Sequence, residues 1–255
     1  MLLSKIIKKR NLEISNHSYL YDVAELVENL EPVKKSASFY DQLAKPGVAS
    51  IGLIQRSAAY EPNPLSDEEV ANLASAYSGC VDAIAIMTEG LYHNGNVDDI
   101  KNCREMTSLP ILQNDILVSP LHVFHAKKLG ASAVIYVSFA LALGELEDFI
   151  RITHGLKMDP VVLVDKKEDI TKALKAGARI LAINNREKRT GRFNPEKIKY
   201  LSGFIPSDVL TVGIGAVHNS QELESLRGCE LNGIFLDHRL LGRVADIKSA
   251  MGNLA

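Results

Sequence analysis

The sequence predicts an α/β fold, a (β/α)8 barrel of the TIM type preceded by a helical extension. Three observations support this prediction: the chain length, eight short apolar runs after residue 48, and the amphipathic stretches that separate these runs. The 255 residues, 46% of them apolar and 24% charged, suit a barrel-sized domain with a large buried core. Runs rich in Val, Ile and Leu are typical of parallel strands that helices cover.

The first part of the chain is expected to form the helical extension. Apolar residues recur there at helical spacing, first from Leu3 to Ile7 and then from Val23 to Leu30. The Pro46-Gly47 pair ends this pattern. We therefore assign residues 1–45 to an extension packed on the barrel, and residues 46–255 to the barrel itself.

Each expected strand is one of the short apolar runs. The runs are Ala49–Ile54, Ala83–Met87, Ile111–Leu112, Ala133–Val137, Val161–Val164, Ile180–Ile183, Val209–Val212 and Gly233–Leu236. The helices expected between them are Asp67–Tyr77, Pro120–Leu129, Leu146–His154, Glu168–Ala176, Asn194–Leu201 and Ser220–Leu226. Gly130, Gly177 and Gly233 precede strands, and each is expected to end a helix in the left-handed conformation. A doubly wound open sheet is the alternative, but no GxGxxG motif follows the first run.

Composition argues against several classes of partner. The net charge of −2 provides no basic field for nucleic acid, and no apolar run approaches the roughly 18 residues of a membrane-spanning helix. The basic stretch from Lys5 to Arg10 is expected to be a solvated helix face. Three cysteines without CxxC spacing indicate neither a disulfide framework nor a zinc site. We expect a cytoplasmic protein in a reducing compartment, with no metal.

Candidate site residues follow from the predicted fold. In a (β/α)8 barrel the chemistry takes place where the strands end, so the residues just after each run are the candidates. They are Gln55-Arg56-Ser57, Thr88-Glu89, Asn114-Asp115, Ser138, Asp165, Asn184-Asn185-Arg186, Gly213–Ala216 and Asp237-His238-Arg239.

Four stretches of the chain resemble the indole-3-glycerol phosphate synthases, the barrel enzymes of tryptophan synthesis. They are Met87–Gly95, Pro110–Asp115, Gly130–Val134 and Ala182–Glu187, and their order matches the family's second, third, fourth and sixth strands. The resemblance covers nearly the whole chain, because the helical start around Ile6 is similar to the family's extension over the barrel. It implies an enzyme that closes an indole ring with loss of CO2.

The reacting centre departs from the family's pattern. The first strand of the family carries a glutamate and a lysine, and the matching positions here are Leu53 and Gln55. The catalytic lysine of its third strand and the glutamate of its fifth strand match Asn114 and Leu163. These neutral side chains cannot deliver a proton to a leaving hydroxyl near neutral pH. The ordinary synthase reaction is therefore not expected.

The segments that hold the substrate phosphate in the family differ as well. They correspond here to Ala58–Tyr60, Ile214–Ala216 and Asp237–Arg239. Such sites bind phosphate through backbone N–H groups and helix N-termini. A carboxylate at Asp237 would repel the anion unless Arg239 pairs with it. We expect the phosphorylated substrate to be lost.

The retained residues imply a pocket for an aromatic carboxylic acid. Asn184 and Arg186 match residues of the family's sixth strand, where the arginine holds the substrate carboxylate. Glu89 is retained on the second strand. A structural interpretation stays open for each of them, because the Asn-Asn-Arg turn can cap a helix and Glu89 can pair with a neighbouring cation.

The departures resemble those of one relative in this family, the cyclase of cyanobacterial scytonemin biosynthesis. This resemblance implies a β-keto acid formed from indole-3-pyruvate and 4-hydroxyphenylpyruvate. The acid would close to a cyclopentane-fused indole with loss of water and CO2. β-Keto acids lose CO2 readily, so no cofactor is expected.

This chemistry implies a role for each candidate residue. Glu89 or His238 would protonate the ketone and the departing hydroxyl. Asn114 and Asn184 would donate hydrogen bonds to the developing oxyanion. The residues expected to contact the substrate are Arg186, which holds its carboxylate, and Arg56, Gln55, His93 and Tyr136.

Two other functions stay open at this point. A catalytically inactive paralogue could bind an indole carboxylic acid or a partner subunit. Residual synthase activity would need a lysine such as Lys34, Lys35 or Lys45 to reach the site from the N-terminal segment.

Overall fold

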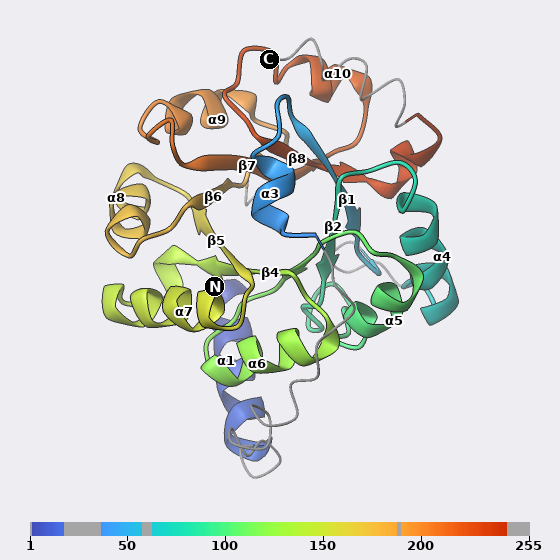
Figure 1. Cartoon of the computed structure of the whole chain (residues 1–255), viewed down its shortest axis with the longest axis vertical. Helices are drawn as coiled ribbons and strands as arrows, with labels where there is room; N and C mark the ends of the chain where they lie inside the picture. The colour runs from blue at the N-terminus through green and yellow to red at the C-terminus, as the bar shows by residue number, and fades with distance from the viewer. Residues whose placement is uncertain (1, 18–36, 58–62, 188–189, 244–255) are drawn as a thin grey trace.

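Eight parallel strands close into one barrel in chain order, with β8 paired back onto β1. The computed structural model describes residues 2–17, 37–57, 63–187 and 190–243. The strands are β1 (Ala49–Ile54), β2 (Ala83–Met87), β3 (Ile111–Asn114), β4 (Ala133–Val137), β5 (Asp159–Val164), β6 (Ile180–Ile183), β7 (Leu210–Val217) and β8 (Gly233–Asp237). The predicted (β/α)8 barrel is therefore confirmed, and each predicted run overlaps one strand (Figure 1).

Helices surround this ring. The described helices are α1 (Leu2–His17), α3 (Phe39–Leu43), α4 (Asp67–Tyr77), α5 (Asp99–Met106), α6 (Pro120–Leu129), α7 (Leu143–Gly155), α8 (Lys167–Lys175), α9 (Pro195–Ser202) and α10 (Ser220–Glu224), with 3₁₀ turns η2 (Ser138–Ala140) and η3 (His238–Arg243). Helix α5 was not predicted, because its sequence is mostly polar and buries only Ile100 and Cys103 as apolar residues. None of the helices described is long and apolar enough to cross a membrane.

Alternation along the strands divides the core into two layers. On β2, Ile84 and Ile86 pack outward against the helices, whereas Ala83 and Ala85 point into the barrel. The barrel interior is filled by side chains such as Leu112 and Phe235, so it is a packed core rather than a channel. Only the ends of the barrel are left to carry a site.

Helix α3 closes the N-terminal end of the barrel. Phe39 and Leu43 are fully buried and belong to the interior cluster. The carboxylate of Asp159, at the start of β5, accepts hydrogen bonds from the Ser38 hydroxyl and the Tyr40 backbone N–H, both at 3.0 Å. These contacts place α3 across the strand starts, at the centre of the ring in Figure 1.

Two of the three glycines predicted to end helices do so. Gly130 and Gly177 have φ angles of +99° and +86°, a region that side chains with a Cβ rarely adopt. The prediction for Gly233 was wrong, because this glycine is the first residue of β8. A Cβ at Gly233 would lie 2.6 Å from Cδ2 of Leu43, so this position needs glycine for the close approach of α3.

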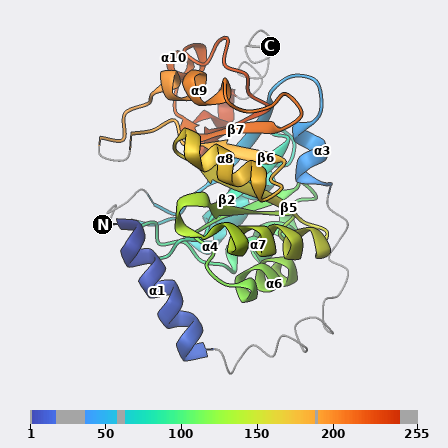
Figure 2. The same ribbon diagram turned by 90° about the vertical axis from the view of Figure 1, so that its left-hand side faces the viewer.

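The N-terminal segment contributes helices at both ends of the barrel. Figure 2 shows α1 and α3 on opposite sides of the ring, and the side chain of Ile6 on α1 is buried. Residues 18–36, which include Lys34 and Lys35, lie outside the described residues. The boundary between an extension of residues 1–45 and a barrel of residues 46–255 stays a prediction.

Replacing Phe39 with Ala should lower the free energy of unfolding by about 3 kcal/mol, because it empties the interior end of the barrel. Urea unfolding followed by circular dichroism measures this change. Tyr200→Ala is the matched control, since that ring is 64% exposed and should cost no more than about 0.5 kcal/mol. Equal losses in the two variants would show that α3 does not seal the barrel.

Candidate active site

The floor of the barrel mouth is apolar. Leu53 and Leu163 lie one residue before the C-terminal ends of β1 and β5, and Ile214 lies within β7. All three are partly exposed and pack on the interior cluster. The alternation of the strands turns all three toward the barrel axis. This floor therefore offers van der Waals contact and a low dielectric, but no group that can transfer a proton.

Two amides stand at the rim of this floor. Asn114 ends β3 and Asn184 directly follows β6, and both are half-buried. The Asn184 Oδ1 accepts the backbone N–H of Arg186 at 3.0 Å, so this amide also shapes the turn after β6. Asn184 therefore has a structural part in the turn, as one interpretation of the Asn-Asn-Arg sequence predicted. Its Nδ2 group can still donate a hydrogen bond to a ligand.

Arg186 lies at the edge of the mouth and binds protein acceptors. Its Nη2 donates to Glu222 Oε2 at 2.7 Å and to the carbonyl oxygen of Ala216 at 2.6 Å, and its Nη1 donates to the carbonyl of Gly191 at 3.1 Å. Nε is buried and has no hydrogen-bond partner among the described residues. A ligand carboxylate would have to displace Glu222 to bind this guanidinium group side-on.

Gly215 permits this placement of Arg186. A Cβ at Gly215 would lie 1.8 Å from Asn185 Oδ1 and 2.9 Å from Arg186 Cγ. The turn after β6 therefore packs directly on the backbone of β7. Gly215 belongs to Ile214–Ala216, which corresponds to one of the family's phosphate-binding segments. In this chain its role is to allow close packing.

Asp237 is a second carboxylate at the edge of the mouth, besides the Glu222 carboxylate that binds Arg186. Oδ1 and Oδ2 accept hydrogen bonds from Nε and Nη2 of Arg239 at 2.7 and 2.9 Å, so the predicted pair is present. Burial raises the pKa of Asp237, but the bonds from Arg239 outweigh burial and hold it below its ordinary value. The other predicted residue of this turn, His238, has its Nδ1 3.8 Å from Asp237 Oδ1.

His218 joins the same group, although no sequence pattern singled it out. It directly follows β7, and its Nε2 lies 3.5 Å from Asp237 Oδ2. Burial and the positive charge of Arg186 lower the pKa of His218 below the ordinary histidine value, against the opposing effect of Asp237 and Glu222. The signal that could have found it is its position one residue after a strand that ends in the mouth.

Glu89 organises the loop after β2. Its two carboxylate oxygens accept the backbone N–H groups of Leu91 at 2.6 Å and Tyr92 at 2.9 Å. His93 and Gln55 meet nearby, because His93 Nδ1 and Gln55 Nε2 lie 3.3 and 2.7 Å from the carbonyl oxygen of Ser57. His93 therefore joins the loops after β1 and β2, whereas Gln55 and Glu89 each bind backbone groups of their own loop.

Arg56 and Tyr136 are not brought to the mouth. Arg56 donates to Asp99 at 2.6 and 2.9 Å and also pairs with Asp67, and these carboxylates raise its pKa. The Tyr136 side chain is fully buried between β4 and α7, where its hydroxyl lies 2.5 Å from Thr153 Oγ1. Burial raises the pKa of Tyr136 well above its usual range.

Arg10 attaches α1 to the C-terminal end of the barrel. Its Nη2 lies 2.5 Å from Asp115 Oδ2, which also accepts the Thr88 hydroxyl at 2.6 Å. The Asp115 side chain is only 1% exposed, so this ion pair is largely shielded from water. The expectation that the stretch from Lys5 to Arg10 is a solvated face was therefore wrong for Arg10, because a partner far along the chain binds it.

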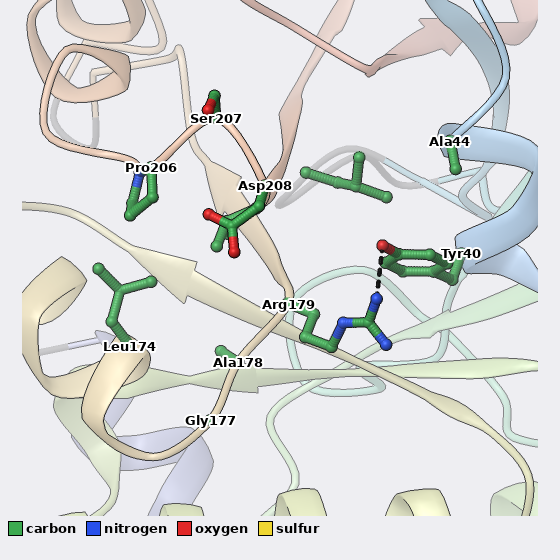
Figure 3. Close-up of a pocket in the computed structure, with 11 residues that line it drawn as sticks. Tyr40, Ala44, Leu174, Gly177, Ala178, Arg179, Pro206, Ser207 and Asp208 are labelled. Carbon is green, nitrogen blue, oxygen red and sulfur yellow. Dashed lines mark hydrogen bonds between the residues drawn. The ribbon is translucent and has the colours of Figure 1, made fainter.

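A separate hollow of about 640 Å³ lies at the opposite end of the barrel. Figure 3 shows Arg179 beside Tyr40 on its wall, with Asp208 among the other residues that line it. Arg179 Nη2 donates to the Tyr40 hydroxyl at 2.8 Å, and the guanidinium also stacks on the ring. These residues stand at strand starts and fix α3, so we place the active site at the mouth instead. Ala58–Tyr60, predicted to have lost phosphate binding, lie outside the described residues.

Comparisons with known proteins agree on family and fold. The sequence profile of the family "Indole-3-glycerol phosphate synthase" matches residues 3–254. The indole-3-glycerol phosphate synthase of Carboxydothermus hydrogenoformans is 30% identical over 252 residues, which is 94% of this chain and 95% of that protein. That of Mycolicibacterium gilvum is 26% identical, over 99% of this chain and 93% of that protein.

Two solved structures share the fold at low sequence identity. The N-acetylmannosamine-6-phosphate 2-epimerase of Clostridium perfringens has a TM-score of 0.61 and 16% identity, over 84% of this chain and 99% of that one. The orotidine 5'-phosphate decarboxylase of Pyrococcus horikoshii has a TM-score of 0.58 and 13% identity, over 80% and 98%. At such identities the likeness concerns the barrel alone.

Replacing Arg10 with Ala should loosen α1, because it leaves the buried Asp115 carboxylate without its counter-ion. We expect amide hydrogen exchange within residues 2–17 to accelerate by about tenfold or more while the barrel strands keep their protection. Lys5→Ala, which removes an exposed cation from the same helix, is the control. Unchanged exchange in the Arg10 variant would mean that the ion pair does not hold α1.

Proposed function

The chain belongs to the indole-3-glycerol phosphate synthase family, and from this premise we propose a cyclase that acts on an unphosphorylated substrate. The substrate is an indole-containing β-keto acid, which the enzyme closes to a cyclopentane-fused indole with loss of water and CO2. This reaction keeps the family's ring closure and decarboxylation but changes the molecule on which they act. It is the kind of step required in scytonemin-type pigment biosynthesis.

The neutral floor of the mouth is the observation that carries this proposal. Leu53, Leu163 and Asn114 occupy the positions where the resemblance places the family's ionisable residues. A floor without acids or bases can hold the indole ring and the ketone in the geometry for attack, and proton transfer then falls to ionisable side chains at the edge of the mouth. The apolar side chains favour aromatic rings over a polar sugar phosphate chain.

The charges beside β7 and β8 favour a carboxylate over a phosphate dianion. Asp237 lies in one of the segments that correspond to the family's phosphate loops, and Glu222 shares the Nη2 group of Arg186 with Ala216 of another. Their own cations, Arg186 and Arg239, already balance them. A phosphate dianion there would face two carboxylates in a partly buried site, which costs more than a single carboxylate that exchanges with Glu222 on Arg186.

The reaction balances without a cofactor. The indole ring carbon attacks the ketone carbon, the carbonyl oxygen takes up a proton, and the ring carbon loses one. The carbon–carbon bond to the carboxylate then breaks, and its electron pair forms a double bond as the hydroxyl group takes a proton and leaves as water. One proton is consumed from solvent for each carboxylate substrate. Asn114 and Asn184 are proposed to donate hydrogen bonds to the oxyanion.

The direct test is turnover of the freshly made coupling product of indole-3-pyruvate and 4-hydroxyphenylpyruvate. We expect CO2 release and a new chromophore faster than in buffer, followed by mass spectrometry. The phosphorylated substrate of the synthase should give no indole fluorescence. Turnover of that substrate would instead establish residual synthase activity, and binding of the keto acid without acceleration would establish a non-catalytic binder.

Arg186→Gln should weaken the binding of carboxylate ligands by about 10- to 100-fold, the usual range for a lost charged hydrogen bond. Indole-3-acetate measured by calorimetry is a suitable probe, and indole-3-acetamide is the control ligand because it lacks the charge. The variant should bind the amide as the parent protein does. An equal loss for both ligands would assign Arg186 a structural role only.

A further inference from the structure

We propose that His218, oriented by Asp237, carries the proton during ring closure and dehydration. The assignment rests on the proposed function and adds to it the acid–base group that the neutral floor of the mouth does not supply. It replaces Glu89 and His238, the two residues expected from the sequence to act as proton donors.

The pairing of β7 with β8 brings the two residues together. Val217, the last residue of β7, pairs with Leu236, so the residues that follow these two, His218 and Asp237, stand side by side. Ala216 belongs to the barrel interior, and strand alternation turns His218 to the same side. On β8, Phe235 points into the barrel, so Asp237, two residues further on, points to the same side. The 3.5 Å between Nε2 and Oδ2 agrees with this placement.

Glu222 fixes the position of His218 relative to Arg186. Its Oε2 accepts the backbone N–H of His218 at 2.8 Å and the Nη2 of Arg186 at 2.7 Å. One carboxylate oxygen therefore holds both the histidine and the arginine proposed to bind the substrate carboxylate. A substrate bound at Arg186 would present its reacting carbons beside the imidazole ring of His218.

The charges that face His218 keep its imidazole neutral near pH 7. Burial and the cations Arg186 and Arg239 lower its pKa, while the carboxylates Asp237 and Glu222 raise it, and the balance lies below the ordinary histidine value. His238 also faces Asp237 from the opposite oxygen. A neutral imidazole accepts a proton first and donates it afterwards.

This order matches two of the three proton transfers of the reaction, the loss of the proton from the indole ring carbon and the protonation of the leaving hydroxyl group. As the new carbon–carbon bond forms, the ketone oxygen takes a proton from solvent and the indole ring carbon gives its proton to His218. The imidazolium then gives that proton to the hydroxyl group, which leaves as water while the carboxylate leaves as CO2. His218 returns to its neutral form, so one solvent proton is consumed in each turnover. Asp237 stabilises the imidazolium in between.

The alternative donors are less well placed for this step. Both oxygens of Glu89 accept backbone N–H groups of its own loop, so proton transfer from Glu89 would break that turn. The His238 Nδ1 lies 3.8 Å from Asp237, and its backbone lies in the turn η3 beyond the strand end. Asp237 thus contacts both histidines, and His218 lies nearer to it.

His218→Gln should lower kcat by about 100-fold or more while KM changes by no more than a few-fold, because an amide cannot carry the proton. His238→Gln should keep kcat within a few-fold of the parent protein. The control is His154→Gln, an exposed histidine near the end of α7 that should leave activity unchanged. Thermal unfolding of each variant checks that the fold is retained.

The pH dependence separates proton transfer from a structural role. Because the neutral imidazole is required, kcat should fall as the pH drops through the pKa of His218, below about 6.5. Asp237→Asn removes a charge that raises this pKa, so the acid limb should move to lower pH. NMR titration of the His218 ring, assigned by its absence in His218→Gln, should show the same shift without substrate.

The outcomes are distinguishable. Absence of turnover by the parent protein would overturn the proposed function, and the role of His218 with it. Turnover that survives in His218→Gln, or a loss of activity in His238→Gln of the size expected for His218, would overturn the role of His218 alone. A ring titration that Asp237→Asn does not move would remove Asp237 as its partner.

Discussion

The closed ring of parallel strands sets where the helices, the core and the mouth of the barrel lie. Because β8 pairs with β1, all strands belong to one ring, their side chains alternate between interior and helix layer, and their C-terminal ends meet at one mouth. This alternation separates residues that the sequence lists side by side. Asp237 turns inward as Phe235 does. Tyr136 turns outward to α7, whereas the residue before it on β4, Ile135, points into the barrel.

The mouth combines an apolar floor with a connected set of charges along one edge. Glu222 binds Arg186 and the backbone of His218, and Asp237 contacts His218, His238 and Arg239. Each carboxylate therefore has a cation near it, and each cation is held in place by a carboxylate. In the proposed function, the carboxylate of the ligand would take the place of Glu222 on Arg186.

Several charged residues that resemble family positions serve the scaffold in this chain. Glu89 folds its own loop, and Arg56 joins the starts of α4 and α5 through Asp67 and Asp99. Arg10 reaches across from α1 to the buried Asp115. A retained residue type thus indicates a retained backbone environment, while its chemical role depends on which acceptors surround it.

The sequence by itself determined the barrel, because apolar runs of strand length separated by amphipathic stretches have few other ways to bury their surface. It also predicted neutral side chains at Leu53, Leu163 and Asn114, but it placed Arg56 and Tyr136 among the substrate contacts, and the structure does not bring these two to the mouth. It did not predict α5, whose burial depends on only two apolar residues, or the partner of Arg10, which lies 105 residues away. The contacts of Glu222 with Arg186 and of His218 with Asp237 form between segments that only the folded chain brings together. These contacts arise from the register between β7 and β8 and from the packing of Arg186 on Gly215, and local patterns carry no information on either.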